Sequence, residues 1–498
     1  MRLTGTKRAV CLLLVCLMAI AAAACATAPD DVTGETTPAT QDTTTAPQQG
    51  DAETTPVETT TAYEEDNIDA GLNFGGEVIN FLYWQDSSYE EFYSEGLTGD
   101  LINDAIYQRN TSVEERLGVD FKFIGADGNE YNEAAFTKKV SSSISAGDHE
   151  FDLIGAYSYT GGLCAAQGLL CDLSDVENLD FEKPWWSEML IKQSTVNNKI
   201  FFVSGDISAN AIYMMYVTFF NKDILSGYGL EDPYGLVNSG KWTIDKQFEM
   251  ASVVYEDLNG NGTKDTGDKC GLYIYTLHYD SFLWGSNIFI IDSFGDTATY
   301  SADFMGEKTV DLQAKIKDFV FDNQGGLAVT DKNQVHQYFA NGLSLFWNDR
   351  CCRAVDFAAT TLNYGIVPVA KYNEAQESYV TIMGNAFTLY CLPKDVEDAD
   401  MMGAVVECMA SESYRTVTPA LFEESFKYKY SQDDNSAKMF DIARGTVVTD
   451  LSRIFSNTLN AYKSWQKAIV GSAGWSSTVK SNQRAWEKQL ELMLEIYE

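Results

Sequence analysis

The sequence of 498 residues contains 72 Asp and Glu but only 35 Lys and Arg, which gives a formal net charge of −37 at pH 7. This charge excludes electrostatic binding to nucleic acid or to an anionic surface, because both would repel the protein. Hydrophobic residues make up 45% and aromatic residues 13% of the chain, so it can form large cores, and its length predicts two lobes or domains.

The N-terminus has the pattern of an export signal. Basic residues among the first eight precede an apolar run from 9 to 24, whose last four residues are alanines followed by Cys25. The run is shorter than the roughly 20 apolar residues that usually span a bilayer. Small residues leading into a cysteine resemble a bacterial lipobox, which implies cleavage before Cys25 and acylation of its thiol, for example with palmitate. An ordinary signal peptide with an incidental cysteine is the alternative.

Residues 26–69 predict a disordered linker. They contain eleven acidic residues, no Lys or Arg and many Thr, so they bury too little apolar surface to offset the entropy lost on ordering. Flexible-chain scaling gives the linker a reach of roughly 35 Å. We therefore expect a signal peptide over 1–24, a lipidated Cys25 with its linker over 25–69, and a folded body over 70–498 at the extracellular face of the cell membrane.

The first part of the body predicts alternating strands and helices. Strand-like runs cover 78–84, 119–123 and 151–156, and residues at helical spacing lie between them, with the second helix ending at Gly147. This order predicts a parallel sheet covered by helices on both faces. Ligands of such sheets bind beyond the carboxyl ends of the strands. The binding candidates after the first and third strands are Trp84, Gln85, Asp86, Tyr157 and Tyr159.

Short motifs in the rest of the body resemble the extracellular solute-binding proteins of ABC importers. Further strands are predicted at 214–220, 343–347, 363–370 and 386–392, and the chain after Asp398 is mostly helical in pattern. The motifs that resemble this family, in its family 1 carbohydrate-binding branch of Gram-positive anaerobes, are 219–223, 241–243, 256–271, 339–342, 364–368 and 430–434. Their order along the chain, across roughly 75–498, makes the resemblance specific.

The resemblance implies an α/β, type II-like periplasmic-binding-protein fold with two lobes and three hinge crossings. Lobe one would comprise about 75–216 and 347–384, and lobe two about 222–342 and 389–498. Ligand binds between such lobes, and their closure presents the loaded protein to the transmembrane subunits of a permease. The implied function is capture of a carbohydrate, of oligosaccharide length, by a monomeric lipoprotein that is not an enzyme.

Aromatic and polar residues near the other strand ends extend the predicted ligand site. Sugar rings stack on aromatic side chains, and their hydroxyls bind Asp, Asn and Gln. About half of such aromatic residues would belong to ordinary cores. Asp206 is included because 206–208 resembles a loop of the same family. The added residues are Asp206, Tyr213, Trp284, Trp347, Asn348 and Asn385.

A twelve-residue loop starting at Asp257 has oxygen-bearing residues at the spacing of an EF-hand loop. Gly262 occupies the sixth position, where a tight turn is needed, and an Asp replaces the usual final Glu. The alternative is a solvated Asp-Asn-Gly turn. The predicted ligands of a structural Ca²⁺ are Asp257, Asn259, Asn261, the Thr263 carbonyl, Asp265 and Asp268.

The sequence contains no recognisable catalytic motif. Its three His have no metal-binding spacing, and it has no nucleophile elbow and no phosphate-binding loop. Seven cysteines follow Cys25, an odd number, and whether Cys164 with Cys171 or Cys351 with Cys352 form disulfides stays open. The alternative functions are a surface glycan-binding lipoprotein without a transport role and a glycan-degrading surface enzyme with a carboxylate pair. Peptides and other polar molecules are alternative ligands for an importer.

Overall fold

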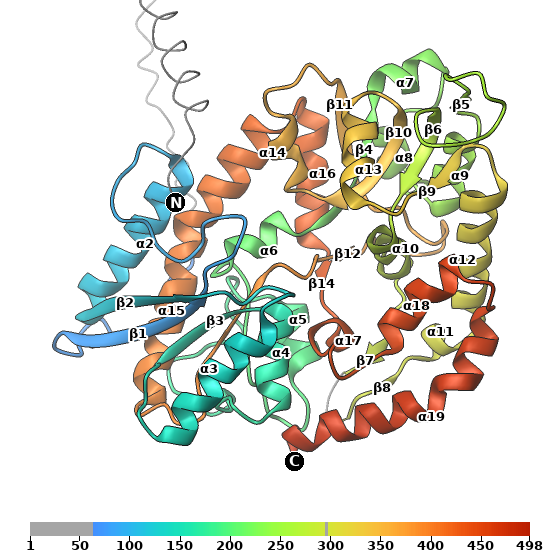
Figure 1. Ribbon diagram of the computed structural model, residues 1–498. Helices are drawn as coiled ribbons and strands as arrows, with labels where there is room; N and C mark the ends of the chain where they lie inside the picture. The colour runs from blue at the N-terminus through green and yellow to red at the C-terminus, as the bar shows by residue number, and fades with distance from the viewer. Residues whose placement is uncertain (1–62, 294–296) are drawn as a thin grey trace, which may run out of the picture. The chain divides into compact units, whose positions relative to one another are not determined.

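Two separate β-sheets organise the residues that the computed structural model describes, 63–293 and 297–498 (Figure 1). The first sheet has the strand order β13-β3-β1-β2, and the second has the order β11-β4-β10-β6-β5 with β9 beside β6. The strands of the first sheet are β1 (Glu77–Trp84), β2 (Val119–Ala126), β3 (Leu153–Tyr157) and β13 (Thr388–Cys391). The strands of the second sheet are β4 (Tyr216–Asn221), β5 (Tyr255–Glu256), β6 (Lys269–Ile274), β9 (Gly326–Ala328), β10 (Ser344–Arg350) and β11 (Tyr364–Pro368). Each sheet forms the centre of one lobe.

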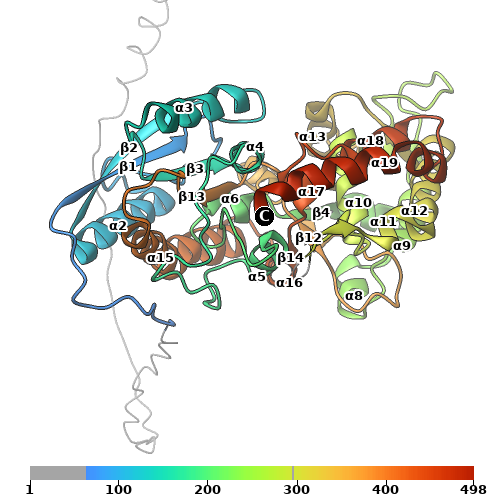
Figure 2. The same cartoon turned by 90° about the horizontal axis from the view of Figure 1, so that it is seen from below.

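The predicted parallel β-α-β-α-β order is confirmed in the first lobe. β1 pairs in parallel with β2 and β3, and the connecting helices are α2 (Leu101–Leu117) and α3 (Glu133–Ala146). Both helices end at a glycine with positive φ, Gly118 at 62° and Gly147 at 67°, a conformation that favours glycine. Figure 2 shows α3 on one face of this sheet and α2 with α15 (Ala399–Arg415) on the other. β13 adds an antiparallel edge, so the complete sheet is mixed.

The second lobe is built around β4, whose six residues are all buried. β4 runs antiparallel to β10 and β11, and β6 runs parallel to β10. Burial on both faces suits a central strand covered by helices. The helices of the lobe are α7 (Lys222–Gly227), α8 (Pro233–Asn238), α9 (Ile244–Ser252), α10 (Tyr279–Gly285), α11 (Ala302–Met305), α12 (Glu307–Lys317), α13 (Lys332–Ala340), α14 (Arg353–Phe357), α16 (Asp434–Gly445), α18 (Ala461–Val470) and α19 (Trp475–Leu494). Some of these helices pack on the sheet and others, such as α18 and α19, pack on α12.

The strand pairing differs from the lobe boundaries predicted from the sequence. β10 and β11 lie within or overlap the segment 347–384 assigned to lobe one, but both pair with β4 in the second sheet. β13 and α15 lie within or overlap the segment 389–498 assigned to lobe two, but β13 pairs with β3 and α15 packs on α2. The reason is that the chain turns back after β10 instead of crossing, so that both edges of the buried strand β4 are covered.

The segments that connect the lobes lie beside one another. The chain leaves the first lobe through α6 (Ala209–Tyr213), returns just before β13, and leaves again through the π-helical segment Pro419–Lys429 before α16. Met215 and Met383 form a bridge between the first two connections, and the Gly384 N–H donates to the Met214 carbonyl at 2.7 Å. β12 (Thr381–Ile382) and β14 (Val447–Val448) pair in parallel at the same place.

The folded body begins before the predicted boundary at residue 70. Asp66 accepts hydrogen bonds from Arg116 at 2.7 and 2.5 Å and from Ser411 at 2.6 Å. Ile68 is buried in the same cluster, which joins α2 to α15. Residues 63–69 therefore belong to the first lobe. The sequence-based prediction was wrong here because an acidic segment looks solvated until its buried cationic partner is known. The rest of the predicted linker, the signal peptide and Cys25 lie outside the described residues.

The seven described cysteines carry free thiols, and six of them are buried. No disulfide joins Cys164 to Cys171 or Cys351 to Cys352 in residues 63–293 and 297–498. Within the same residues, every helix is too short or too polar to cross a membrane.

Candidate functional site

Four of the predicted ligand-binding residues meet around Arg453 in α17 (Leu451–Ile454). The Arg453 Nη2 donates to the Asn385 Oδ1 at 2.5 Å, and the guanidinium lies 4.8 Å from the centre of the Trp284 ring. Tyr157 and Tyr159 form an edge-to-face pair with ring centres 5.4 Å apart. Burial raises the pKa of both hydroxyls and the Arg453 charge lowers it; burial has the larger effect, so the pKa of Tyr159 is raised to about 12. The cluster therefore combines aromatic rings with hydrogen-bonding groups.

Both lobes contribute to this interlobe cluster, which we define as Tyr157, Tyr159, Asp280, Trp284, Asn385, Arg453 and Tyr462. Tyr157 ends β3, and Tyr159 lies in the first turn of α4 (Ser158–Ala166) of the first lobe. Trp284 lies in α10 of the second lobe. Asn385 lies on the connection between them, and its carbonyl accepts from the Ser158 Oγ at 2.6 Å. The cluster therefore lies beyond the carboxyl end of β3, the edge of the sheet where we expect a ligand to bind.

A buried ion pair holds the centre of the interlobe cluster. The Arg453 Nη1 donates to the Asp280 Oδ2 at 2.9 Å, and both residues are buried. Tyr462 also donates to Oδ2, at 2.8 Å, and Gln466 donates to Oδ1 at 2.9 Å. Burial raises the pKa of Asp280, whereas the Arg453 charge and these hydrogen bonds lower it. The pair carries no net charge, so the cluster presents hydrogen-bonding groups without a surplus of either sign.

Asp450 fixes the orientation of the Trp284 ring through a hydrogen bond to its indole nitrogen. The Trp284 Nε1 donates to the Asp450 Oδ2 at 3.0 Å, and the same oxygen accepts from the Ile290 N–H at 2.7 Å. The other carboxylate oxygen caps α17 by accepting from the Ser452 N–H at 2.9 Å. Asp450 therefore positions both the Trp284 face and the helix that carries Arg453.

The three predicted residues at the end of β1 lie outside the interlobe cluster, and only Trp84 packs against one of its members. Trp84 is buried, donates to the Thr388 Oγ1 at 2.9 Å and packs against the Tyr157 ring at 5.3 Å. Gln85 donates to Asp127 at 2.9 Å, away from the interlobe cluster. Asp86 accepts from the Gly128 and Asn129 N–H groups and from the Asn132 side chain, and so closes the loop after β2.

Trp347 and Asn348 lie inside the second lobe. The Trp347 ring is fully buried beside Phe219 and Phe339, with ring centres 5.6 and 5.7 Å away. The Asn348 Oδ1 accepts from Thr218 and Gln247, and its amide donates to Ser281. Both side chains therefore have structural partners, and their position next to a strand end gave no indication of which face of β10 they occupy.

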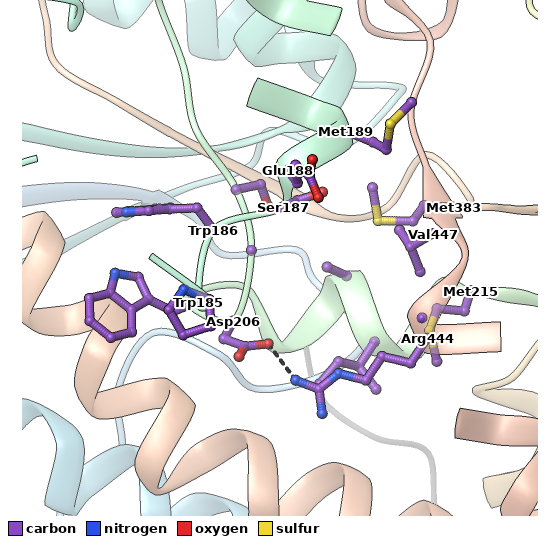
Figure 3. A pocket seen from close by; sticks show the side chains of 16 residues that line it. Trp185, Trp186, Ser187, Glu188, Met189, Asp206, Met215, Met383, Arg444 and Val447 are labelled. Atoms are coloured by element: carbon purple, nitrogen blue, oxygen red, sulfur yellow. Dashed lines mark hydrogen bonds and ion pairs between the residues drawn. The ribbon is translucent and has the colours of Figure 1, made fainter. Parts of the chain in front are cut away.

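Asp206 lies in a separate cavity near the connections between the lobes, shown in Figure 3. Its Oδ1 accepts from the Arg444 Nη2 at 2.9 Å, and burial raises its pKa while Arg444 opposes the shift. Tyr213 lies at the end of α6, on the first connection between the lobes, but stacks on Tyr89, with rings 4.0 Å apart and 11° from parallel.

The cavity that contains Asp206, which we call the hinge pocket, has a volume of about 250 Å³. It is lined by Pro184, Trp185, Trp186, Ser187, Glu188, Met189, Ser204, Gly205, Asp206, Ala211, Ile212, Met215, Met383, Arg444, Gly445 and Val447.

No pattern in the sequence indicated Arg453, Asp280 or Tyr462 as site residues. Acidic residues are so frequent in this chain that a buried one does not stand out. The only local signal is the spacing of Asp450 before a short helix, which is typical of an N-cap. That signal predicts where α17 begins and says nothing about the partners of its side chains.

The predicted calcium loop forms a compact network of its own side chains. Asp257 accepts from the Gly260 and Gly262 N–H groups at 2.7 and 2.8 Å. The Asn259 and Asn261 amides donate to Asp265 at 2.9 and 2.6 Å. Within 63–293 and 297–498, no group of three or more His, Cys, Asp or Glu side chains is arranged to hold a metal ion. Coordination would therefore require the two amides to rotate so that their oxygens face inward.

Comparisons with solved structures identify the fold. The GacH receptor of Streptomyces glaucescens, solved unliganded and with acarbose, is 15% identical, covers 84% of this chain and 99% of its own, and has a TM-score of 0.53. The galacto-N-biose-/lacto-N-biose I-binding protein of an ABC transporter from Bifidobacterium longum is 13% identical, with coverage of 84% and 98% and a TM-score of 0.57. The chain has the two-lobe solute-binding fold.

The same fold also holds ligands that are not sugars. A Mycobacterium tuberculosis protein solved with glycerophosphocholine is 14% identical, covers 84% of this chain and 99% of its own, and has a TM-score of 0.52. No family model matches the sequence, and no curated protein matches it. The fold alone therefore does not determine the class of ligand.

Proposed function

We propose that this chain is the substrate-binding lipoprotein of an ABC importer, which captures a carbohydrate between its lobes and delivers it to a membrane permease. The observation that carries the proposal is the interlobe cluster, in which residues of both lobes and of the connection meet around Arg453. The rings of Tyr157, Tyr159 and Trp284 match the apolar faces of sugars. The amide, guanidinium and phenol groups match sugar hydroxyls.

The hydrogen bonds of the carboxylates in and beside this cluster favour binding of a ligand without catalysis. Asp280 is fully engaged by Arg453, Tyr462 and Gln466, and Asp450 by Trp284 and backbone N–H groups. A glycosidase needs one carboxylic acid that is free to donate a proton and a second carboxylate facing the sugar. Here the acidic groups position other side chains. Solved proteins of this fold that bind oligosaccharides, such as one complexed with maltotetraose, support the same class of ligand.

A thermal-shift screen of the protein over monosaccharides and oligosaccharides tests the proposal, followed by calorimetry with any sugar that raises the Tm. We expect Tyr159→Ala and Trp284→Ala each to weaken binding by about tenfold or more, since an aromatic contact contributes roughly 1 kcal/mol or more. Tyr428→Ala, which removes an aromatic ring that is 82% exposed, is the matched control and should bind normally.

Three outcomes would contradict the assignment. A flat response over a broad sugar panel would exclude carbohydrate as the ligand. Normal affinity in both cleft variants would place the site elsewhere. Release of shorter sugars from a bound oligosaccharide would identify an enzyme. Co-purification with a permease would separate an importer from a surface glycan-binding protein that lacks a transport role.

We also propose that Cys25 carries a lipid that holds the protein at the extracellular face of the membrane. The alanine run before Cys25 and the acidic, Thr-rich segment behind it support this proposal. Cys25→Ser should move the protein from the membrane fraction to the medium, as measured by fractionation. A membrane-bound Cys25→Ser variant would contradict the lipid anchor.

A structural Ca²⁺ in the loop that starts at Asp257 is a separate proposal. The spacing of its oxygen ligands supports it, as do the hydrogen bonds from the Gly262 N–H to Asp257 and from the Asn261 amide to Asp265, which fold the loop around both carboxylates. We expect a lower Tm in excess EDTA than in CaCl₂, and no such difference in Asp257→Asn. Asp175→Asn, at an exposed turn, should retain it. Equal Tm values with chelator and with calcium would exclude the site.

A further inference from the structure

The helix α19, with 20 residues, is anchored in the second lobe at its start. The Trp475 Nε1 donates to the Phe304 carbonyl at 2.6 Å, and the Trp475 N–H donates to the Gln313 side chain at 2.7 Å. The helix then packs on α12 and α18 of the same lobe. Figures 1 and 2 show it running from there towards the first lobe, where the chain ends.

The turn that follows α19, Glu495–Tyr497, is attached to the first lobe. The Tyr497 side chain is buried, with its ring centre 5.2 Å from that of Phe201, and the Tyr497 carbonyl accepts from the Asn197 Nδ2 at 2.8 Å. The segment that carries both partners continues to Val203, which forms a bridge to β13 of the first sheet. Helix and turn together therefore have one end in each lobe, and we call the turn the C-terminal clasp.

A second contact joins the lobes close to the C-terminal clasp. Ser293 follows β7 (Ile291–Asp292) of the second lobe, and its Oγ donates to the Gln193 carbonyl at 2.6 Å. Gln193 lies in α5 (Glu188–Ser194) of the first lobe, four residues before Asn197. Both contacts are separate from the three connections, so the lobes are held together at a further place besides the connections themselves.

The interlobe cluster is enclosed between the connections and the clasp. Asp280 and Trp284 have no exposed surface, and Arg453 is 5% exposed. In Figure 1, α17 lies between α6 and β12 on one side and the end of the chain on the other. A ligand therefore reaches the cluster only when the lobes separate. Because α19 is fixed to the second lobe, a separation that turns about the connections pulls Tyr497 away from Phe201.

We propose that the C-terminal clasp is a conformational restraint that holds the lobes together and determines how often the interlobe cluster opens. The proposal rests on the proposed function in one respect, namely that the cluster is the ligand site. While the clasp is engaged, ligand neither enters nor leaves, and its release lets α19 move with the second lobe. A ligand held between closed lobes favours the same state, so the clasp raises the affinity by increasing the closed population.

Amide hydrogen exchange of the full chain, measured by mass spectrometry without any ligand, tests the clasp. We expect the peptide that contains α17 to exchange about threefold to tenfold faster in Tyr497→Ala, because an aromatic contact shifts an equilibrium by about that factor. Peptides from β1 and β4 should exchange at the wild-type rate, since each lobe keeps its own core. Asn197→Asp removes the donor to the Tyr497 carbonyl and should also speed exchange of α17. Asp tolerates the positive φ of 50° at position 197.

Two variants serve as controls. The buried Tyr497 hydroxyl makes no hydrogen bond to the residues that the structure describes, so Tyr497→Phe keeps the ring contact and should exchange like the wild type. Leu492→Ala shortens a side chain of α19 that is 48% exposed and should also leave the exchange of α17 unchanged.

Two results would overturn the clasp. One is wild-type exchange of the α17 peptide in Tyr497→Ala. The other is an equal acceleration in α17, β1 and β4, which would mean that Tyr497 stabilises the whole fold and not the closed arrangement. If circular dichroism shows that Tyr497→Ala is unfolded, Asn197→Asp decides by the same criteria. Since no ligand is added, failure of the clasp would leave carbohydrate binding intact, and a chain that binds no sugar could still have the clasp.

Discussion

Glu407 is a buried residue of the first lobe whose ionisation changes the stability of the fold. Its carboxylate accepts from Trp185 and Trp186 and, at 3.3 Å, from the Asp180 N–H. Burial outweighs these hydrogen bonds and raises its pKa to about 7. The folded protein thus binds this proton more tightly than the unfolded chain, so the stabilisation is complete below about pH 4.5 and is lost as the pH rises to about 7.

We predict that the free energy of unfolding falls by roughly 2–3 kcal/mol over this pH range because of Glu407. Urea unfolding of Glu407→Gln should show a correspondingly flatter pH dependence than the wild type. The exposed neighbour Glu182, changed to Gln, is the control. An unchanged slope in Glu407→Gln would show that this carboxyl group ionises normally.

Arg453 and Asp280 allow a second test at the level of single residues. Removing either partner of a buried ion pair leaves an uncompensated charge and costs about 3–5 kcal/mol. We therefore expect Arg453→Met and Asp280→Leu each to lower the free energy of unfolding by that amount. The double variant should be more stable than the sum of the two losses predicts. Additive losses in urea unfolding would mean that the pair is not energetically coupled.

At the scale of elements, residues 63–69 act as part of the first lobe. Arg116 holds the pKa of Asp66 at about 2 even though burial opposes the shift, which reflects strong binding of this carboxylate. Deleting 63–69 from the full chain should lower the free energy of unfolding by roughly 2–4 kcal/mol, through exposure of the Ile68 site and loss of the charged hydrogen bonds. Deleting 40–46 is the matched control, and equal stability of the two deletions would contradict this role.

The sequence predicted seven of the fourteen strands found in the described residues, but not which strands are neighbours. Apolar runs bounded by Gly, Asn or Asp predicted β1, β3, β4, β10 and β11 close to their observed positions. The assignment of strands to lobes was wrong because strand pairing depends on which edge of β4 is left uncovered. The sequence of a single strand does not determine which edge that is. For the same reason Trp284 and Trp347 looked alike in the sequence, and both are fully buried, Trp284 against Arg453 in the interlobe cluster and Trp347 in the core of the second lobe.

At the scale of the whole molecule, the two connections that meet at Met215 and Met383 determine how the lobes are joined. Gly384 lies so close to β10 that an added Cβ would stand 2.6 Å from the Arg350 Cδ. Arg350 is held by Asp349 at 2.8 Å, so it cannot move away freely. A larger side chain at position 384 must therefore displace either the Arg350 side chain, which breaks its ion pair with Asp349, or the connection itself.

We predict that Gly384→Val weakens binding of the cleft ligand by about tenfold or more while leaving the secondary structure intact, because each lobe keeps its own core. Calorimetry with the sugar found in the screen measures this, and circular dichroism checks the fold. Gly96→Val, where an added Cβ meets nothing within 4 Å, is the control. Unchanged affinity in Gly384→Val would show that the connection tolerates displacement.

The attachment of residues 63–69 has a mechanical consequence. The Asp66 carboxylate joins the start of the folded chain to Arg116 of α2 and Ser411 of α15, both in the first lobe. A force applied to the chain before Tyr63 is therefore transmitted to these two helices and not to the connections between the lobes. If the protein is tethered through its N-terminus, the first lobe is the anchored lobe, and the second lobe is the one that moves relative to the membrane when the lobes open or close.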